Sequence, residues 1–214
     1  MSRNPLQREG ERVAIVDGIR SPFVKSWTTL NRVDPVALST QITRELLARQ
    51  EIRPEWLDHI VWGTVICVTA SPNVAREIAL DLSLYGTPGY TVTRACATGL
   101  QAVASATEMI LSGRADTIVA GGVDMASFAP VPHKKALIDR LLAGSKGGPA
   151  KMLGTLATTN PALFFPQAPT ITERYTGRTM GQHAEEMAQH YEISREAQDE
   201  IALASYRNAA KAIE

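Results

Sequence analysis

The chain has 214 residues, with 22 basic and 22 acidic side chains and two cysteines. This length can bury a hydrophobic core. The balanced charge argues against nucleic acid as a partner, and two cysteines are too few for a disulfide framework. No apolar run reaches the roughly eighteen residues of a membrane span. Residues 1–11 are polar and lack the apolar core of a secretory signal. We therefore expect a cytoplasmic protein with a disordered tail over residues 1–11.

Residues 12–128 alternate between apolar runs and helical patterns. Buried strands are predicted at residues 12–17, 59–68, 89–94 and 117–122. Asp34 followed by Pro35 is a helix-start signal, Ser71–Pro72 is another, and a third helix is predicted over residues 97–113. Strands that alternate with helices favour an α/β fold, with a mixed, mainly parallel sheet and right-handed crossovers.

The composition changes after residue 128. Residues 129–178 are rich in proline and glycine, and residues 134–144 are the clearest short helical piece among them. Two helices are predicted next, over residues 180–191 and from an N-cap at Ser194 to the end of the chain. We expect residues 129–214 to form a separate, partial helical domain that stops inside its last helix.

Cys96 lies at the hinge between a predicted strand and a predicted helix. Ligands of parallel α/β sheets bind at the carboxyl ends of the strands. Free N–H groups and the macrodipole at a helix N-terminus favour negative charge, and therefore the nucleophilic thiolate. The same N–H groups can stabilise an oxyanion on a substrate. A buried, inert cysteine is the alternative for Cys96, and it is the interpretation we adopt for Cys67, inside the predicted strand 59–68.

The helix after Cys96 is rich in alanine, which indicates a helix that other backbone approaches closely. We expect it to be buried on all sides.

Four segments together resemble the thiolases, the acyl-CoA C-acyltransferases, over nearly all of the chain after residue 11. They are "RVAIVDGIRSPF", "VWGTVICVTASPNVAREIAL", "VTRACATGLQAVASATEMILSGRADTIVAGGVDMAS" and "GRTMGQHAEEMAQHYEISREAQDEIALAS". The segment "RACAT" and the basic, proline-bearing stretch after residue 129 are most similar to the 3-ketoacyl-CoA thiolase subunit of fatty-acid β-oxidation complexes. The resemblance implies a thiolase N-terminal α/β domain at residues 12–128, built as a βαβαβ half, and a loop domain at residues 129–214.

The resemblance also implies a reaction. Cys96 would attack the 3-keto carbonyl of a 3-ketoacyl-CoA, release acetyl-CoA, keep the shortened acyl group as a thioester and pass it to free CoA. Coenzyme A would be a co-substrate, and no metal or covalently bound cofactor is expected. Met180 and Gly181 match positions that line the acyl and pantetheine channel, although Thr179 stands where many thiolases carry histidine. Gly121 and Gly122 match a Gly-Gly pair that gives backbone clearance near the active centre.

Three motifs of the thiolase second half do not occur in this sequence: Gly-His-Pro, Asn-Glu-Ala-Phe and Cys-x-Gly. Of the histidines present, His59, His183 and His190 are more typical of surface or capping residues. His133 lies in the proline- and glycine-rich stretch and matches no histidine of the family. We therefore expect the N-terminal portion of a thiolase, incomplete alone, whose cysteine helix lacks part of its apolar surroundings. The expected partners are acyl-CoA, CoA, a separate C-terminal half, a hydratase/dehydrogenase subunit, and further copies in a homodimer or tetramer when complete.

Two other functions stay open. One is a biosynthetic acetoacetyl-CoA thiolase, which differs in substrate chain length. The other is a non-catalytic acyl-CoA-binding or assembly fragment, in which Cys96 would be inert. A basic cluster could contact CoA phosphates, an anionic membrane surface or the hydratase/dehydrogenase subunit. A solvated face is the interpretation we adopt, because charge runs usually form one. The members of the cluster are Lys134, Lys135, Arg140, Lys146 and Lys151.

Overall fold

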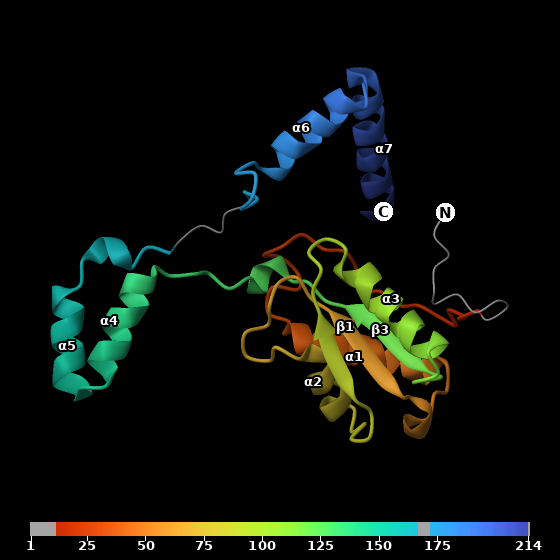
Figure 1. The fold of residues 1–214 in the computed structure, drawn as a ribbon, viewed down its shortest axis with the longest axis horizontal. Coiled ribbons are helices and arrows are strands. Elements are labelled where there is room, and N and C mark those ends of the chain that lie inside the picture. Colours follow the sequence, from red (N-terminus) through yellow and green to blue (C-terminus); the bar gives the residue numbers. More distant parts are fainter. Residues whose placement is uncertain (1–11, 167–171, 214) are drawn as a thin grey trace. The chain divides into compact units, whose positions relative to one another are not determined.

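The computed structural model describes residues 12–166 and 172–213, which fall into two compact units that meet in sequence at Pro130 and Val131 (Figure 1). The predicted tail at residues 1–11 lies outside the described residues. The strands are β1 (His59–Gly63), β2 (Gly89–Val92) and β3 (Ile118–Gly122). The helices are α1 (Pro35–Arg49), α2 (Val74–Asp81), α3 (Thr98–Leu111), α4 (Lys135–Ser145), α5 (Gly148–Thr158), α6 (Met180–His190) and α7 (Arg195–Ile213).

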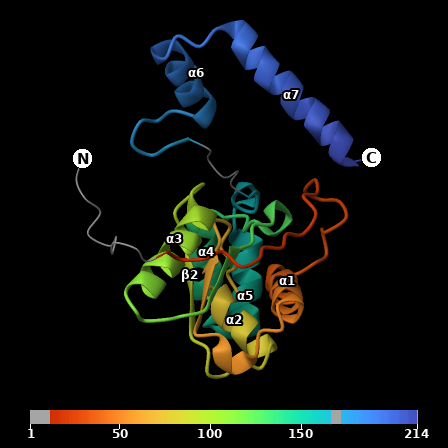
Figure 2. The same cartoon turned by 90° about the vertical axis from the view of Figure 1, so that its right-hand side faces the viewer.

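The first unit is a βαβαβ arrangement around a three-stranded sheet of order β2-β1-β3. Both strand pairs are parallel, with Ile60 opposite Gly89 and opposite Val119. The chain steps from β1 to β2 and then back past β1 to β3. Right-handed crossovers that run in opposite directions place their helices on opposite faces. Figure 2 accordingly shows α3 on one face and α2 with α1 on the other. This is the expected α/β fold.

The core lies between the sheet and α2. Ile60 and Ile78 are fully buried, and Trp62, Val74 and Val119 pack with them. Each large aliphatic side chain that is fully buried contributes about 1.5–3 kcal/mol relative to an exposed one. Asn73, rather than Ser71, caps α2: its Oδ1 accepts from the Arg76 N–H at 3.2 Å, while its Nδ2 donates to the Gly89 carbonyl at 3.0 Å. The cap therefore also ties α2 to β2.

The strand predicted at residues 12–17 is absent. Ile15 is 83% exposed and Val16 is 77% exposed, and this segment pairs with no strand among the described residues. Its end is held against α1 by a hydrogen bond from Gln50 Nε2 to Asp17 Oδ2, 2.8 Å long. An apolar run becomes a strand only where a sheet edge satisfies its N–H and C=O groups, and the sequence pattern does not show whether such an edge is available.

The strand predicted at residues 59–68 ends early, at Gly63. The next residues turn away because the Asp124 carboxylate accepts the backbone N–H groups of Val65 at 2.8 Å and Ile66 at 2.7 Å. Cys67 is therefore in a loop and exposed, and the prediction of a buried strand cysteine was wrong.

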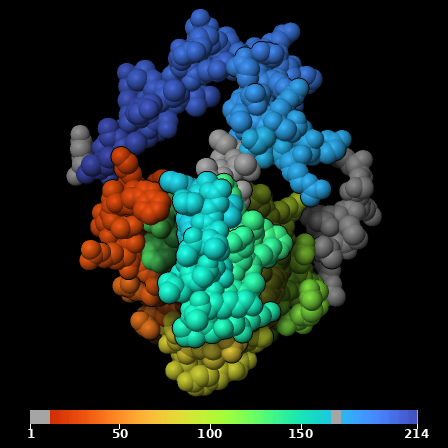
Figure 3. All heavy atoms as spheres, turned by 90° about the vertical axis from the view of Figure 1, so that its left-hand side faces the viewer, coloured from red at the N-terminus to blue at the C-terminus, as the bar shows by residue number. Residues whose placement is uncertain are grey.

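The second unit contains a helical hairpin where only short helical pieces were expected, with residues 134–144 as the clearest. In Figure 3 the spheres of α4 (green) and α5 (cyan) lie against each other. Arg140 of α4 connects the two by donating to the Thr158 carbonyl and the Thr159 hydroxyl, both at 3.2 Å. The missed helix starts in a glycine-rich stretch, but Pro149 near its beginning is a helix-start signal.

Helices α6 and α7 match their predicted ranges. Ser194 acts as the expected cap, since its Oγ accepts from the Ala197 N–H at 3.2 Å. In the part of the chain that the structure describes, no helix has the length and apolar character needed to cross a membrane.

Candidate active site

Cys96 lies in the turn between the end of β2 and the start of α3, at the carboxyl edge of the sheet. Its side chain is exposed rather than packed among aliphatic groups. The preceding residue, Ala95, has a φ of 45°, in the left-handed region that side chains with a Cβ avoid. Such a conformation costs about 1–2 kcal/mol and persists only where the surroundings hold it. The backbone is thus held in an unfavourable turn directly before the thiol.

Thr98, the first residue of α3, holds this turn. Its Oγ1 accepts from the Arg94 N–H at 2.7 Å and donates to the Ala95 carbonyl at 2.6 Å. The Ala95 carbonyl also accepts from the Thr98 N–H at 3.1 Å, and the Arg94 carbonyl accepts from the Ala97 N–H at the same distance. Thr98 is 3% exposed, so its hydroxyl makes these bonds away from solvent.

The amino end of α3 leaves backbone donors open beside Cys96. Its N-cap, Ala97, has no side chain that can accept a hydrogen bond. Among the described residues, the N–H groups of Cys96, Gly99 and Leu100 have no hydrogen-bond acceptor. Free N–H groups at a helix N-terminus favour a thiolate and can stabilise an oxyanion. The open N–H groups that the prediction requires are therefore found, and the reactivity of Cys96 stays a prediction.

Gly63 allows the start of α3 to approach the sheet closely, and two further glycines allow close contacts within the sheet. A Cβ on Gly63, the last residue of β1, would lie 2.6 Å from Thr98 Cγ2. A Cβ on Gly122 would lie 2.8 Å from the Gly63 carbonyl oxygen, and one on Gly121 would lie 2.5 Å from the Trp62 ring. Gly122 therefore gives clearance to backbone, as expected, whereas Gly121 gives clearance to the Trp62 side chain. The sequence reasoning missed Gly63 and Thr98, for which a glycine inside the predicted strand 59–68 was the only signal.

Helix α3 is not buried on all sides, contrary to expectation. Thr98, Ala102 and Ala106 are buried at four-residue spacing, which forms one face toward the sheet. Leu100 is 74% exposed and Val103 is 39% exposed. No described element covers these two side chains. The small residues permit close approach, but the described chain contacts only one side of the helix.

Met180 and Gly181 lie at the amino end of α6, in the second unit, whereas Cys96 belongs to the first. Met180 is 68% exposed. Thr179 is the N-cap of a capping box, because its Oγ1 accepts from the Gln182 N–H at 3.3 Å and its own N–H donates to Gln182 Oε1 at 2.8 Å. The threonine that stands in place of the family histidine therefore starts a helix.

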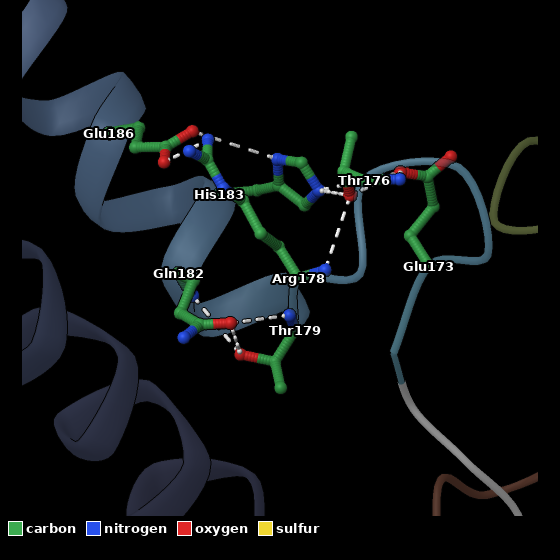
Figure 4. Close-up of polar contacts among 7 residues, drawn as sticks. All are labelled: Glu173, Thr176, Arg178, Thr179, Gln182, His183 and Glu186. Carbon is green, nitrogen blue, oxygen red and sulfur yellow. Dashed lines mark hydrogen bonds and ion pairs between the residues drawn. The ribbon is translucent and has the colours of Figure 1, made fainter.

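A polar cluster precedes and joins this helix start (Figure 4). His183 Nε2 lies 3.0 Å from the Thr176 hydroxyl, which donates to Glu173 at 2.5 Å. Arg178 forms an ion pair with Glu186. The hydrogen bond from Thr176, with a weaker contribution from the charge of His183, holds the pKa of Glu173 below its usual range. His183 was expected to be a surface or capping residue, and here it links the loop to α6.

No metal site is evident in the described ranges 12–166 and 172–213: no three side chains among histidine, cysteine, aspartate and glutamate are grouped to hold an ion.

Comparison with known proteins gives similar relatives and a similar structure. A 3-ketoacyl-CoA thiolase of Photobacterium profundum is 40% identical over 212 residues, which are 98% of this chain and 49% of the relative. A 3-ketoacyl-CoA thiolase of Aeromonas salmonicida is 41% identical over 215 residues, again 49% of its length. The chain thus spans about half the length of these curated relatives.

The crystal structure of the Bacillus anthracis acetyl-CoA acetyltransferase superposes with a TM-score of 0.65 and 30% sequence identity. The superposition covers 86% of this chain and 43% of that one. The family model described as "Thiolase, N-terminal domain" matches residues 13–214. Together with the βαβαβ fold and the cysteine at the strand–helix hinge, this match shows that the chain belongs to the thiolase family.

Proposed function

We propose that this chain is the part of a 3-ketoacyl-CoA thiolase of fatty-acid β-oxidation that carries the acyl-accepting cysteine, Cys96. The observation that carries the proposal is the exposed Cys96 thiol beside open N–H groups at the start of α3. The names of relatives at about 40% identity support the substrate class. Residues 12–128 would be the α/β domain, and residues 129–214 the loop domain whose Met180 and Gly181 line the acyl channel.

In the proposed reaction the Cys96 sulfur bonds to C3 of a 3-ketoacyl-CoA. The C2–C3 bond then breaks, and its electron pair leaves with acetyl-CoA, which takes up a proton. The shortened acyl group remains on sulfur as a thioester until the thiol of free CoA displaces Cys96. Because one thioester replaces another, this transfer is close to neutral in energy. The resemblance assigns the proton donor to a second half of the protein.

The location and partners belong to the same proposal. Both cysteines are free and exposed, which supports the reducing environment of the cytoplasm. Acyl-CoA and CoA are the proposed small-molecule partners, with a C-terminal half, a second copy and a hydratase/dehydrogenase subunit as protein partners.

The proposal is tested by intact-mass measurement after exposure to a 3-ketoacyl-CoA. We expect an acyl adduct on the wild-type chain, no adduct on Cys96→Ser, and an unchanged adduct on Cys67→Ser, which is the matched control because Cys67 is also exposed. An adduct that survives in Cys96→Ser would contradict the assignment. Complete turnover is tested by mixing the chain with a separately produced C-terminal half. Thiolysis no greater than that of either half alone would count against this pairing.

A biosynthetic acetoacetyl-CoA thiolase is the second candidate, and the superposed acetyl-CoA acetyltransferase favours considering it. Adduct formation with substrates of increasing acyl length separates the two. Reaction restricted to acetoacetyl-CoA would favour the biosynthetic enzyme, whereas a preference for longer chains would favour the degradative one. If neither class leaves an acyl adduct on Cys96, the third possibility, a non-catalytic acyl-CoA-binding module, is favoured.

A further inference from the structure

The turn that carries Cys96 depends on very few side chains. Arg94, Ala95 and Ala97 contribute backbone hydrogen bonds to it, and α3 has no side-chain cap. The Arg94 side chain donates to Gln101 of α3 at 2.6 Å. Among the described residues, Thr98 is the one side chain that bonds to the backbone of the turn, through both functions of its hydroxyl. A hydroxyl offers one donor and two acceptor positions, so it can join an N–H group and a carbonyl at once. The left-handed Ala95 lies between these two bonded groups.

The other end of the Thr98 side chain meets the sheet. Its methyl group faces Gly63 so closely that a Cβ there would lie 2.6 Å from Cγ2, well inside van der Waals contact. Gly63 is itself fixed in β1 by its pairing with Val92 and Gly122. The methyl group thus fixes the distance between the turn and the sheet, and the hydroxyl fixes the conformation of the turn.

We infer that Thr98 is the positioning residue for Cys96. Its hydroxyl closes the left-handed turn and its methyl group rests on Gly63. Together they keep the thiol beside the open N–H groups of α3. This inference rests on the proposed function, because it takes Cys96 as the reacting group. Thr98 touches no reacting atom; it acts through the backbone that presents the sulfur. Without it, Ala95 can relax from its left-handed conformation, and the thiol moves away from the helix N-terminus.

The test uses the full chain and compares two substitutions of similar size. Thr98→Val keeps the shape but loses the hydroxyl, whereas Thr98→Ser keeps the hydroxyl but loses the methyl group. The readout is the ratio of iodoacetamide alkylation rates at Cys96 and Cys67, measured by peptide mass spectrometry. Because both thiols are exposed, Cys67 corrects for reagent and pH. Amide hydrogen exchange at Arg94 reports directly on the bond to Oγ1.

We expect Cys96 in the wild type to react about fivefold faster than Cys67, the effect of a favourable helix N-terminus. Thr98→Val should bring the ratio close to one and speed exchange at the Arg94 amide. Thr98→Ser should retain most of the ratio and the protection. A folded Thr98→Val chain with the wild-type ratio would overturn the inference. A greater loss in Thr98→Ser than in Thr98→Val would also overturn it, because the hydroxyl would then not be the group that closes the turn.

A second pair of variants decides the matter if Thr98→Val does not fold. Gly63→Ala keeps the hydroxyl but pushes the methyl group away from the sheet. Gly86→Ala is its control, since a Cβ at Gly86 meets nothing within 4 Å. We expect the ratio to fall in Gly63→Ala alone; equal ratios in the two variants would overturn the inference.

The wild-type ratio separates this inference from the proposed function. A wild-type ratio near one contradicts the reactive cysteine itself, and with it the positioning role. A raised wild-type ratio that Thr98→Val leaves unchanged contradicts only the positioning role.

Discussion

Two helices of this chain have a threonine at their amino ends, and the two threonines have different roles. At α6, Thr179 precedes the helix and its hydroxyl accepts the Gln182 N–H, as part of a reciprocal capping box. At α3, Thr98 is already inside the helix and its hydroxyl faces backward, to Arg94 and Ala95. The first hydroxyl satisfies a donor of its own helix, while the second satisfies groups of the turn before the helix.

The two helix starts differ in what lies beside their open N–H groups, not in how many are open. Among the described residues, the N–H groups of Gly99 and Leu100 at α3, and those of Met180 and Gly181 at α6, have no hydrogen-bond acceptor. At α3 the exposed Cys96 precedes these groups, whereas a capping box precedes them at α6. Free N–H groups at a helix N-terminus favour a negatively charged group, so the neighbouring thiol distinguishes α3 from α6.

The largest effect on stability is expected from a substitution at Ala95, in the turn before α3. Ala95→Val places a β-branched side chain at a φ of 45° and should lower the free energy of unfolding by about 2 kcal/mol. Urea denaturation measures the loss. Ala97→Val is the control, because the Ala97 φ of −91° lies outside the left-handed region. Equal stability of the two variants would show that Ala95 is not held in the left-handed region.

The next effect concerns the loop anchored beside this edge of the sheet. Asp124→Ala removes the acceptor of two backbone N–H groups, those of Val65 and Ile66, and should cost about 1.5 kcal/mol. Asp124→Asn keeps an acceptor oxygen at the same place and should cost less. Urea denaturation of both variants measures the difference. If both lose the same stability, the hydrogen bonds do not provide the anchor.

Local sequence signals predicted the elements that depend on local chemistry. Asp34 followed by Pro35 gave the start of α1, and the Asp34 carboxylate does accept the Ala37 N–H at 3.0 Å. Apolar runs that alternate with helical patterns predicted all three strands of the sheet. The position of Cys96 between β2 and α3 followed from these predictions. These features depend on residues close together in the chain, so the local sequence pattern was sufficient to predict them.

Features that depend on distant partners were not predictable in the same way. The run at residues 12–17 has the composition of a strand but no partner edge, so Ile15 remains exposed. The early end of β1 depends on Asp124, which is about sixty residues further along the chain. The role of Thr98 depends on the φ of Ala95 and on the closeness of Gly63. The spacing of apolar residues along the chain predicts none of these three features.

A substitution at Thr179, the N-cap of α6, is expected to have a smaller effect on stability. Thr179→Ala removes the N-cap and should reduce the stability of α6 by about 1 kcal/mol. Thr179→Ser is the matched control, since it keeps the accepting hydroxyl. Hydrogen exchange of the first α6 amides measures the change. The alkylation ratio of Cys96 to Cys67 should stay at its wild-type value, because this cap serves its own helix; a fall in that ratio would contradict the division of roles.

The smallest effect is expected at the opposite edge of the sheet from Cys96. The Asp58 carboxylate accepts the N–H groups of Asp116 at 2.7 Å and Thr117 at 2.9 Å, and these bonds hold the pKa of Asp58 below its usual range. A lowered folded-state pKa stabilises the fold above the unfolded pKa, and this stabilisation is lost as the pH falls through the folded pKa.

Asp58→Asn should therefore lower the free energy of unfolding at pH 7 by about 0.5 kcal/mol, a small value because the carboxylate is exposed. The gap from wild type should close as the pH falls below about 4, where the unfolded carboxyl group becomes protonated. Urea denaturation at a series of pH values measures the gap, and a gap independent of pH would contradict a contribution from the charge. Cys96 alkylation should be unaffected, since Asp58 anchors the amino ends of β1 and β3 while Thr98 acts at their carboxyl ends.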